Sequence, residues 1–433
     1  MERFATNRFS VFILSPRPRY LEERPLDREE DFCGDNISTI SRPWLWKHWF
    51  NICSESHEKC RALDHKSEKF LPDRLLEILT GDGGKSFNWK LVHSAGLHDI
   101  MYATLSHCWG ASQHAKLERE NYLFRMEPTS SFWLPKTFRD AFYIAFKLGF
   151  RFIWIDSLCI VQDDNDDWLT QASMMGSIYE NASCNIAATW ARDGDNGCFS
   201  TREMNESTTI SLDFPPGETK DYQFDDCRRY HNELTKAPLN TRGWVIQERY
   251  LARRQLSFAQ SQVYWECREL TASEQYPKGI PKDLIDDNPL LLPPGKPTLD
   301  YLDTIERRSG WIRLVNHYSL CKFSKISDKM IALAGLARQM SLMQDDTYLA
   351  GLWKKDLQDQ LCWRTDDKAE TDVLRIPSYL APTWSWASID GPVISDLSYH
   401  WKNLASRSLI KFWMYRSIRN TNSTYTVSLH PAW

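Results

Sequence analysis

Trp244 and Glu248 stand four positions apart in the segment TRGWVIQERY, a spacing that places both on one face of a helix. Such a pair sets an aromatic ring beside a carboxylate. It is suited to catalysis or ligand binding if the carboxylate opens into a partly dry cleft. The alternative is structural, with the Trp244 ring in the core and Glu248 paired with Arg242 or Arg249 at the surface. The spacing alone is compatible with both interpretations.

Two further polar residues follow predicted strands. Asp156 ends the apolar run RFIWID, and His107 ends MYATLSH. Ligands of open parallel sheets bind in the crevice outside the carboxyl ends of the strands, so both side chains are candidates for a pocket. Asp156 could instead cap the next turn through the amides of Leu158 or Cys159, and His107 could be a hydrogen-bonded core histidine.

A cysteine nucleophile is the rival chemistry at the same strand ends. Adjacent residues of an extended chain point to opposite faces, so Cys108 is poorly placed to pair with His107, whereas Cys159 is not restricted in this way. A reactive thiolate needs a lowered pKa, and buried inert thiols are far more common. We therefore treat Cys159, together with Gln162 of the same segment, as a pocket residue.

Cys53, His57 and Cys60 recur at positions i, i+4 and i+7, which would place them on one face of a helix. Three zinc ligands are available there, but no fourth is identifiable and the spacing differs from the usual C-x2-C knuckle. Small sulfur-containing residues on the buried stripe of a helix explain the pattern equally well. The sequence therefore predicts core packing and no metal.

Strands and helices alternate between residues 101 and 189. The predicted strands MYATLSH, RFIWID and ASCNIAAT are separated by helices over 134–150 and 165–182, the second with Asn165 as its candidate N-cap. This order implies right-handed crossovers and a parallel sheet that is buried on both faces. A helix and a strand follow over 239–258, and QVYWEC adds another strand. The predicted fold class is α/β, a central and mostly parallel sheet flanked by helices, with a mainly helical C-terminal region.

We expect three parts in the chain. Residues 1–90 are predicted to form an extended arm and a helical lead-in, with at most one short strand in the first 40 residues. Residues 91–270 are predicted to form the α/β domain. Residues 271–433 are predicted to form a helical and mixed region packed on that core.

The composition predicts a protein with well-filled cores that does not bind polyanions. Its 433 residues are 42% hydrophobic, which is ample for two or three cores. A formal net charge of −4 without Lys/Arg runs argues against nucleic acid and anionic membranes as partners. We expect neither a membrane span nor a signal peptide. Eleven cysteines without paired spacing suit free thiols, so we expect the cytoplasm, with the nucleus as the alternative.

Three segments together resemble the blocks that define the fungal heterokaryon-incompatibility (HET) domain. They are YATLSHCWG, LPKTFRDAFYIAFKLGFRFIWIDSLCIVQDD and TRGWVIQERYLARRQLSF, in the expected order and separation. The flanking sequence, including the C-x3-H-x2-C segment that begins at Cys53, resembles the family as well. The resemblance implies a stand-alone HET protein whose core is distantly similar to the Toll/interleukin-receptor (TIR) domain.

An enzymatic function is the first that the resemblance implies. HET proteins execute the cell-death reaction when genetically unlike fungal hyphae fuse, and some TIR domains hydrolyse NAD. Trp244-x-x-x-Glu248 resembles the element that carries the catalytic glutamate in those TIR domains. Glu248 is then the candidate catalytic carboxylate, with His107, Asp156 and Arg242 shaping a pocket in which NAD is a substrate and not a cofactor.

Two other functions are compatible with the same resemblance. The chain could be a signalling module without turnover that self-assembles into a homo-oligomer or engages protein partners of the incompatibility response. It could also be an ancillary or tailoring protein of a secondary-metabolite pathway. Release of nicotinamide from NAD separates the first function from these two.

Overall fold

A computed structural model describes residues 12–16, 42–64, 70–110, 115–202, 209–213, 219–226, 229–281, 284–285, 304–366 and 373–395. Contacts divide the chain into one unit over Met1–Lys296 and a second over Pro297–Trp433. Of the arm expected in the first 40 residues, only β1 (Phe12–Pro16) lies within the described residues.

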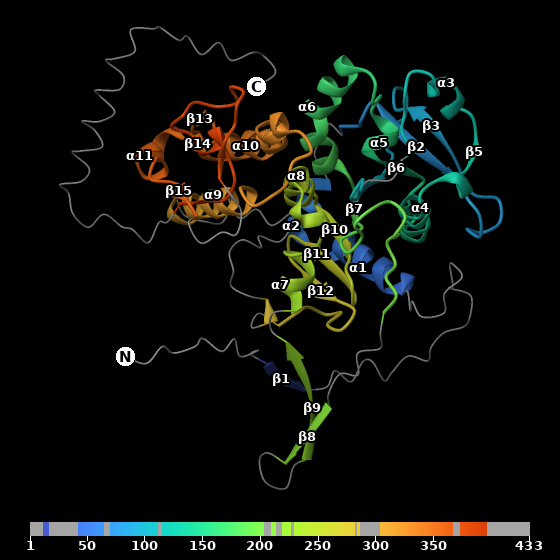
Figure 1. The fold of residues 1–433 in the computed structure, drawn as a ribbon. Helices are drawn as coiled ribbons and strands as arrows, with labels where there is room; N and C mark the ends of the chain where they lie inside the picture. Colours follow the sequence, from blue (N-terminus) through green and yellow to red (C-terminus); the bar gives the residue numbers. More distant parts are fainter. Residues whose placement is uncertain are drawn as a thin grey trace. The chain divides into compact units, whose positions relative to one another are not determined.

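A nine-stranded sheet forms the centre of the first unit, in the order β12-β11-β10-β7-β4-β6-β2-β3-β5 (Figure 1). Its strands are β2 (Arg74–Leu79), β3 (Asn88–His93), β4 (Tyr102–Ser106), β5 (Thr129–Ser130), β6 (Phe152–Trp154), β7 (Cys184–Ala187), β10 (Arg254–Phe258), β11 (Val263–Cys267) and β12 (Thr271–Ser273). The four central strands β10, β7, β4 and β6 are parallel, and antiparallel strands extend the sheet on both sides. The predicted α/β class with a mostly parallel centre is confirmed.

Helices connect the central strands in the predicted order. The helices of the first unit are α1 (Pro43–Ser56), α2 (Glu58–Asp64), α3 (Tyr122–Arg125), α4 (Lys136–Leu148), α5 (Asp156–Cys159), α6 (Asn165–Asn181), α7 (Arg229–Leu234) and α8 (Gly243–Leu251). α4 lies in the crossover from β4 to β6, and α6 in the crossover from β6 to β7. The cap of α6 is Asp164, whose carboxylate accepts two amide hydrogen bonds of the first turn, so the cap lies one residue before the predicted Asn165.

The two crossovers cover opposite faces of the sheet. Because β4 lies between β6 and β7, the chain moves along the sheet in one direction through α4 and returns through α6. Right-handed crossovers in opposite directions place their helices on opposite faces. On the face of α6, Trp154 packs edge-on against Tyr179, with ring centroids 5.8 Å apart. α8 packs beside α6 (Figure 1).

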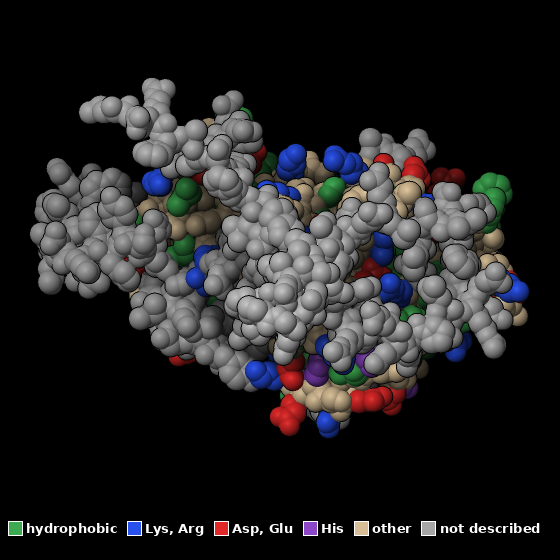
Figure 2. Space-filling view, turned by 90° about the horizontal axis from the view of Figure 1, so that it is seen from below, with side chains coloured by type: hydrophobic (Ala, Val, Ile, Leu, Met, Phe, Trp, Pro, Cys, Tyr) green, Lys and Arg blue, Asp and Glu red, His purple; other side chains and the backbone are tan. Residues whose placement is uncertain are grey.

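A smaller sheet in the same unit joins β1 to the hairpin of β8 (Thr209–Asp213) and β9 (Thr219–Asp226). Acidic and basic side chains are interspersed on the described surface that is visible in Figure 2. Among the described residues, no helix has both the length and the apolar character that crossing a bilayer requires.

The second unit consists of helices and short hairpins. They are α9 (Thr304–Tyr318), α10 (Ile331–Gln344), α11 (Leu357–Gln360) and the pairs of β13 (Tyr348–Leu349) with β14 (Leu352–Trp353), β15 (Arg364–Thr365) with β18 (Val393–Ile394), and β16 (Leu374–Arg375) with β17 (Ile389–Asp390). Trp311 and Trp386 are buried, and each indole Nε1 donates a hydrogen bond to the Gly351 carbonyl at 3.0 Å. The core of this unit therefore centres on one backbone carbonyl.

Candidate functional site

The carboxyl ends of β4 and β6 form the switch point of the sheet. The two strands are parallel neighbours, yet the chain leaves β4 toward α4 on one face and leaves β6 toward α6 on the other. Such divergence opens a crevice at the strand ends, where open α/β sheets bind ligands. His107 directly follows β4, and Asp156 begins α5 two residues after β6. The topology thus brings both predicted residues to the same end of the sheet.

The Asp156 carboxylate contacts several hydrogen-bond donors there. Its Oδ1 lies 3.8 Å from His107 Nδ1 and accepts a hydrogen bond from the Ser157 amide at 2.7 Å. Its Oδ2 accepts a hydrogen bond from Trp109 Nε1 at 2.9 Å. The Asp156 side chain remains 20% exposed, whereas His107 is buried with its ring edge-on to Phe138. The amides of Leu158 and Cys159 donate to the Ile155 carbonyl, so the alternative in which Asp156 caps the turn through them is wrong, and its carboxylate keeps an open side toward solvent.

Glu248 lies inside the protein, on the face of the sheet that α6 and α8 cover. Only 4% of the residue is exposed, and the side chains of Ser106 and Tyr179 lie beside its carboxylate. Burial raises the pKa of Glu248 to about 7, whereas the charge of Arg242 and the neighbouring Ser106 and Tyr179 side chains lower it. The negative charge of Asp156 contributes to this raised pKa. This burial excludes the surface pairing considered above.

Two arginines near Glu248 have different roles. Arg242, at the N-cap position of α8, donates a hydrogen bond through Nη1 to the His107 carbonyl and so ties α8 to the end of β4. Arg249 is buried and pairs through Nη2 with Glu266 Oε1 at 2.7 Å. Arg242 is therefore the cation of the candidate site, and Arg249 belongs to the core.

Trp244 and Glu248 both face α6, as the four-residue spacing predicts. The Trp244 ring packs at 90° against Trp168 near the start of α6, with centroids 6.3 Å apart. Glu248 contacts Tyr179 near the end of the same helix. Trp244 and Glu248 therefore both lie at the α6–α8 interface, toward opposite ends of α6.

Cys159 and Gln162 occupy supporting positions in the turn after β6. Burial raises the pKa of the Cys159 thiol to about 12, so at neutral pH this sulfur is protonated and is a poor nucleophile. Burial also raises the pKa of Cys108. The Gln162 amide donates hydrogen bonds to the carbonyls of Asp156 and Ile160, at 3.2 and 3.1 Å, and so stabilises the turn that carries Asp156.

Sequence reasoning missed a buried polar network that leads to Glu248. Asn185 of β7 donates hydrogen bonds through Nδ2 to Ser106 Oγ at 3.0 Å and to Gln255 Oε1 at 2.9 Å. Thr104 donates a hydrogen bond to Asn185 Oδ1 at 3.0 Å. Polar residues at alternate positions of otherwise apolar strands, as in T-x-S of β4, were the available signal, because alternate residues share one face.

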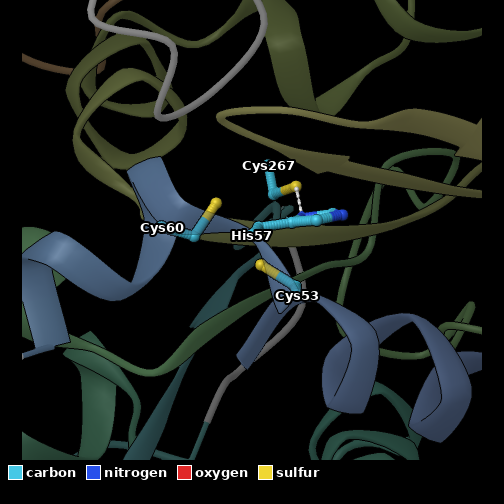
Figure 3. Close-up of side chains that lie close together, drawn as sticks. All are labelled: Cys53, His57, Cys60 and Cys267. Atoms are coloured by element: carbon cyan, nitrogen blue, oxygen red, sulfur yellow. Dashed lines mark hydrogen bonds between the residues drawn. The ribbon is translucent and has the colours of Figure 1, made fainter. Parts of the chain in front are cut away.

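A surface hollow and a cysteine–histidine cluster lie at the opposite end of the parallel strands, where these strands begin. The hollow is lined by Thr80, Phe146 and Arg151, among other residues. Cys53, His57, Cys60 and Cys267 gather near the start of β10 (Figure 3). They could hold a metal ion, and they lie at the start of β10, whereas Ser106 beside Glu248 lies at the end of β4.

Comparison with known proteins supports the interpretation of the central strands. Residues 102–248 match the family model described as "Heterokaryon incompatibility protein (HET)". The match starts at the first residue of β4 and ends at Glu248, so it includes the switch point and the candidate carboxylate. Searches of curated proteins and of solved structures find no significant match. The resemblance seen in the sequence is confirmed for this segment, and residues 102–248 form a heterokaryon incompatibility (HET) domain.

Proposed function

We propose that this HET protein hydrolyses the bond between nicotinamide and ribose in NAD, and that it thereby acts as a cell-death effector in fungal allorecognition. The observation that carries the proposal is the buried Glu248, whose pKa is raised to about 7 beside Arg242 and Asp156. A carboxyl group with a pKa near the working pH is well suited to act in both its protonation states.

The proposed reaction uses Glu248 as the catalytic carboxylate. The bond from the ribosyl carbon to the nicotinamide nitrogen breaks, and the electron pair leaves with neutral nicotinamide. Ionised Glu248 stabilises the positive charge that develops on the ribose. Water then attacks this carbon and passes its proton through Glu248 to solvent, so the products are ADP-ribose and nicotinamide.

Access is the main requirement of this proposal. Glu248 is only 4% exposed, so NAD has to displace part of its cover. We propose that the Trp168–Trp244 contact between α6 and α8 opens to admit NAD. The proposed site of action is the NAD pool of the cytoplasm.

Purified full-length protein incubated with NAD, with nicotinamide quantified by chromatography, tests the proposal. We expect release by the wild type and a loss of about 100-fold or more in Glu248→Gln, which keeps the shape but not the charge. Glu120→Gln, at an exposed carboxylate of the same domain, is the matched control and should retain the wild-type rate. Intact NAD after prolonged incubation with folded wild type would refute the hydrolase.

A signalling module without turnover is the second candidate function. The same burial favours it, because a carboxylate held by Ser106 and Tyr179 inside a closed interface can serve the fold alone. In that case a homo-oligomer or a protein partner transmits the death signal. Expression in a fungal host would then kill cells while NAD persists, and Glu248→Gln would leave the killing intact.

A further inference from the structure

Four potential metal ligands converge from two distant parts of the sequence. Cys53 lies in α1, Cys60 in α2, His57 between the two helices, and Cys267 at the end of β11. Their ligand atoms all lie within 4.8 Å of one another, and Figure 3 shows the three sulfur atoms turned toward the imidazole ring. The fourth ligand, which the sequence did not reveal, is Cys267.

A break in the helix brings the first three ligands into position. The continuous helical face expected for them is wrong, because α1 ends at Ser56 and α2 begins at Glu58. His57 between them has an extended backbone, with φ −80° and ψ 106°. This break turns the imidazole toward the end of β11, where Nδ1 lies 3.3 Å from Cys267 Sγ.

The geometry fits a tetrahedral zinc site. Zinc binds thiolate at about 2.3 Å and imidazole at about 2.0 Å, so the sulfur-to-nitrogen edge of the tetrahedron is about 3.5 Å. The observed 3.3 Å between Cys267 Sγ and His57 Nδ1 is close to that edge. Three cysteines and one histidine form a complete structural zinc set, and thiolate ligands disfavour magnesium and calcium.

The surroundings supply the charge and the donors that zinc thiolates require. Three thiolates around a dication carry a net charge of −1. Arg254, which is 2% exposed, donates a hydrogen bond through Nε to Cys53 Sγ at 3.1 Å and offsets this charge. The Leu270 amide donates a hydrogen bond to Cys267 Sγ at 3.3 Å within the β11–β12 turn. Such donors orient and tune metal ligands.

We propose that Cys53, His57, Cys60 and Cys267 bind one structural zinc ion. Apolar packing does not require three sulfurs and a ring nitrogen to face one point, and a disulfide would use only two of the four groups. The ion would fasten the α1–α2 lead-in to the β11–β12 hairpin. The two segments are already joined by a hydrogen bond from the Lys59 amide to Glu269 Oε1 at 2.6 Å. The site lies where the parallel strands begin, and Glu248 lies near their carboxyl ends. This proposal is therefore independent of the proposed hydrolase activity.

Metal analysis of the full-length wild type is the first test. After growth with zinc and removal of loosely bound metal by gel filtration, we expect about one zinc per chain. Replacement by cobalt should produce the strong visible bands of tetrahedral cobalt and a thiolate-to-cobalt charge-transfer band. Zinc below about a tenth of an equivalent in folded protein, even after incubation with equimolar zinc, would overturn the proposal.

Ligand variants provide the second test. Cys267→Ser should lose the zinc and unfold at a lower temperature, whereas Cys184→Ser, at a buried thiol outside the cluster, should keep one equivalent. His57→Cys should also keep the metal, because four cysteines are an equally good zinc set. If Cys267→Ser does not fold, the cobalt spectrum of the wild type decides. A disulfide between any two of the three cysteines, found by mass spectrometry of the fresh protein, contradicts the zinc site.

Discussion

The Ser106 side chain lies beside the Glu248 carboxylate and lowers its pKa, which couples the last residue of β4 to the middle of α8. Ser106 also accepts a hydrogen bond from Asn185, so the Glu248 carboxylate lies at one end of a polar network that starts at the centre of the sheet. In a low-dielectric interior, such a network depends strongly on the charge of each member. The protonation of Glu248 should therefore affect stability as well as chemistry.

Stability should fall with pH because of Glu248. Its pKa is raised by burial from 4.5 to about 7, so the folded state holds a proton that the unfolded chain releases above about pH 4.5. This contribution is complete at low pH and is lost as the pH rises through about 7. Relative to Glu248→Gln, the free energy of unfolding of the wild type should drop by about 3 kcal/mol over this interval. Urea unfolding at a series of pH values measures the difference, and parallel curves would contradict the buried carboxyl group.

Ser106→Ala and Tyr179→Phe should each raise the pKa of Glu248 further. Each variant removes a hydroxyl group that lowers the pKa of Glu248, and the loss corresponds to a shift of about one pH unit. NMR titration of labelled glutamate carboxyl carbons measures it without any need for activity. Ser173→Ala, on the exposed side of α6, is the control and should leave the titration unchanged. An unshifted titration in both variants would show that these hydroxyl groups do not lower the pKa of Glu248.

Glu266→Ala should destabilise the first unit by about 3–5 kcal/mol. The substitution leaves the buried Arg249 guanidinium without its carboxylate, and it also removes the acceptor of the Tyr230 hydroxyl, 2.5 Å away. The double variant Arg249→Met/Glu266→Leu removes both charges and should lower the stability of the first unit less than Glu266→Ala does. Chemical denaturation compares them. A double variant that is less stable than Glu266→Ala would mean that the ion pair is a net source of stability.

Gly351→Ala should destabilise the second unit by about 2–4 kcal/mol. Gly351 has a φ of 100°, and an added Cβ would lie 2.6 Å from Trp386 Nε1, in the centre of the indole core. Gly310→Ala in α9 is the matched control, because nothing lies within 4 Å of its added Cβ. A helix interior favours alanine, so this control should be neutral or slightly stabilising. Thermal unfolding followed by tryptophan fluorescence distinguishes the two, and equal stabilities would contradict the packing described here.

The α/β class and the strand ends with His107 and Asp156 could be predicted from sequence, since strand and helix periodicities are local properties. Because these patterns are local, the sequence did not predict features that depend on distant segments. β2 joins the sheet through antiparallel pairing with β6, which follows later in the chain, and β3 pairs with β2, so no short-range pattern encodes the partner of this hairpin. The helix break at His57 was missed because the spacing of its neighbours is also compatible with one continuous helix.

The sequence by itself determined the HET domain over residues 102–248, the central α/β pattern and the presence of a carboxylate one helical turn after Trp244. Only the tertiary structure decided that Glu248 is buried against Ser106 and Tyr179, and that Cys267 completes a four-ligand cluster with Cys53. The reason is physical. Periodicity records which residues share a face, whereas burial, pKa and metal geometry arise from contacts between segments that are far apart along the chain.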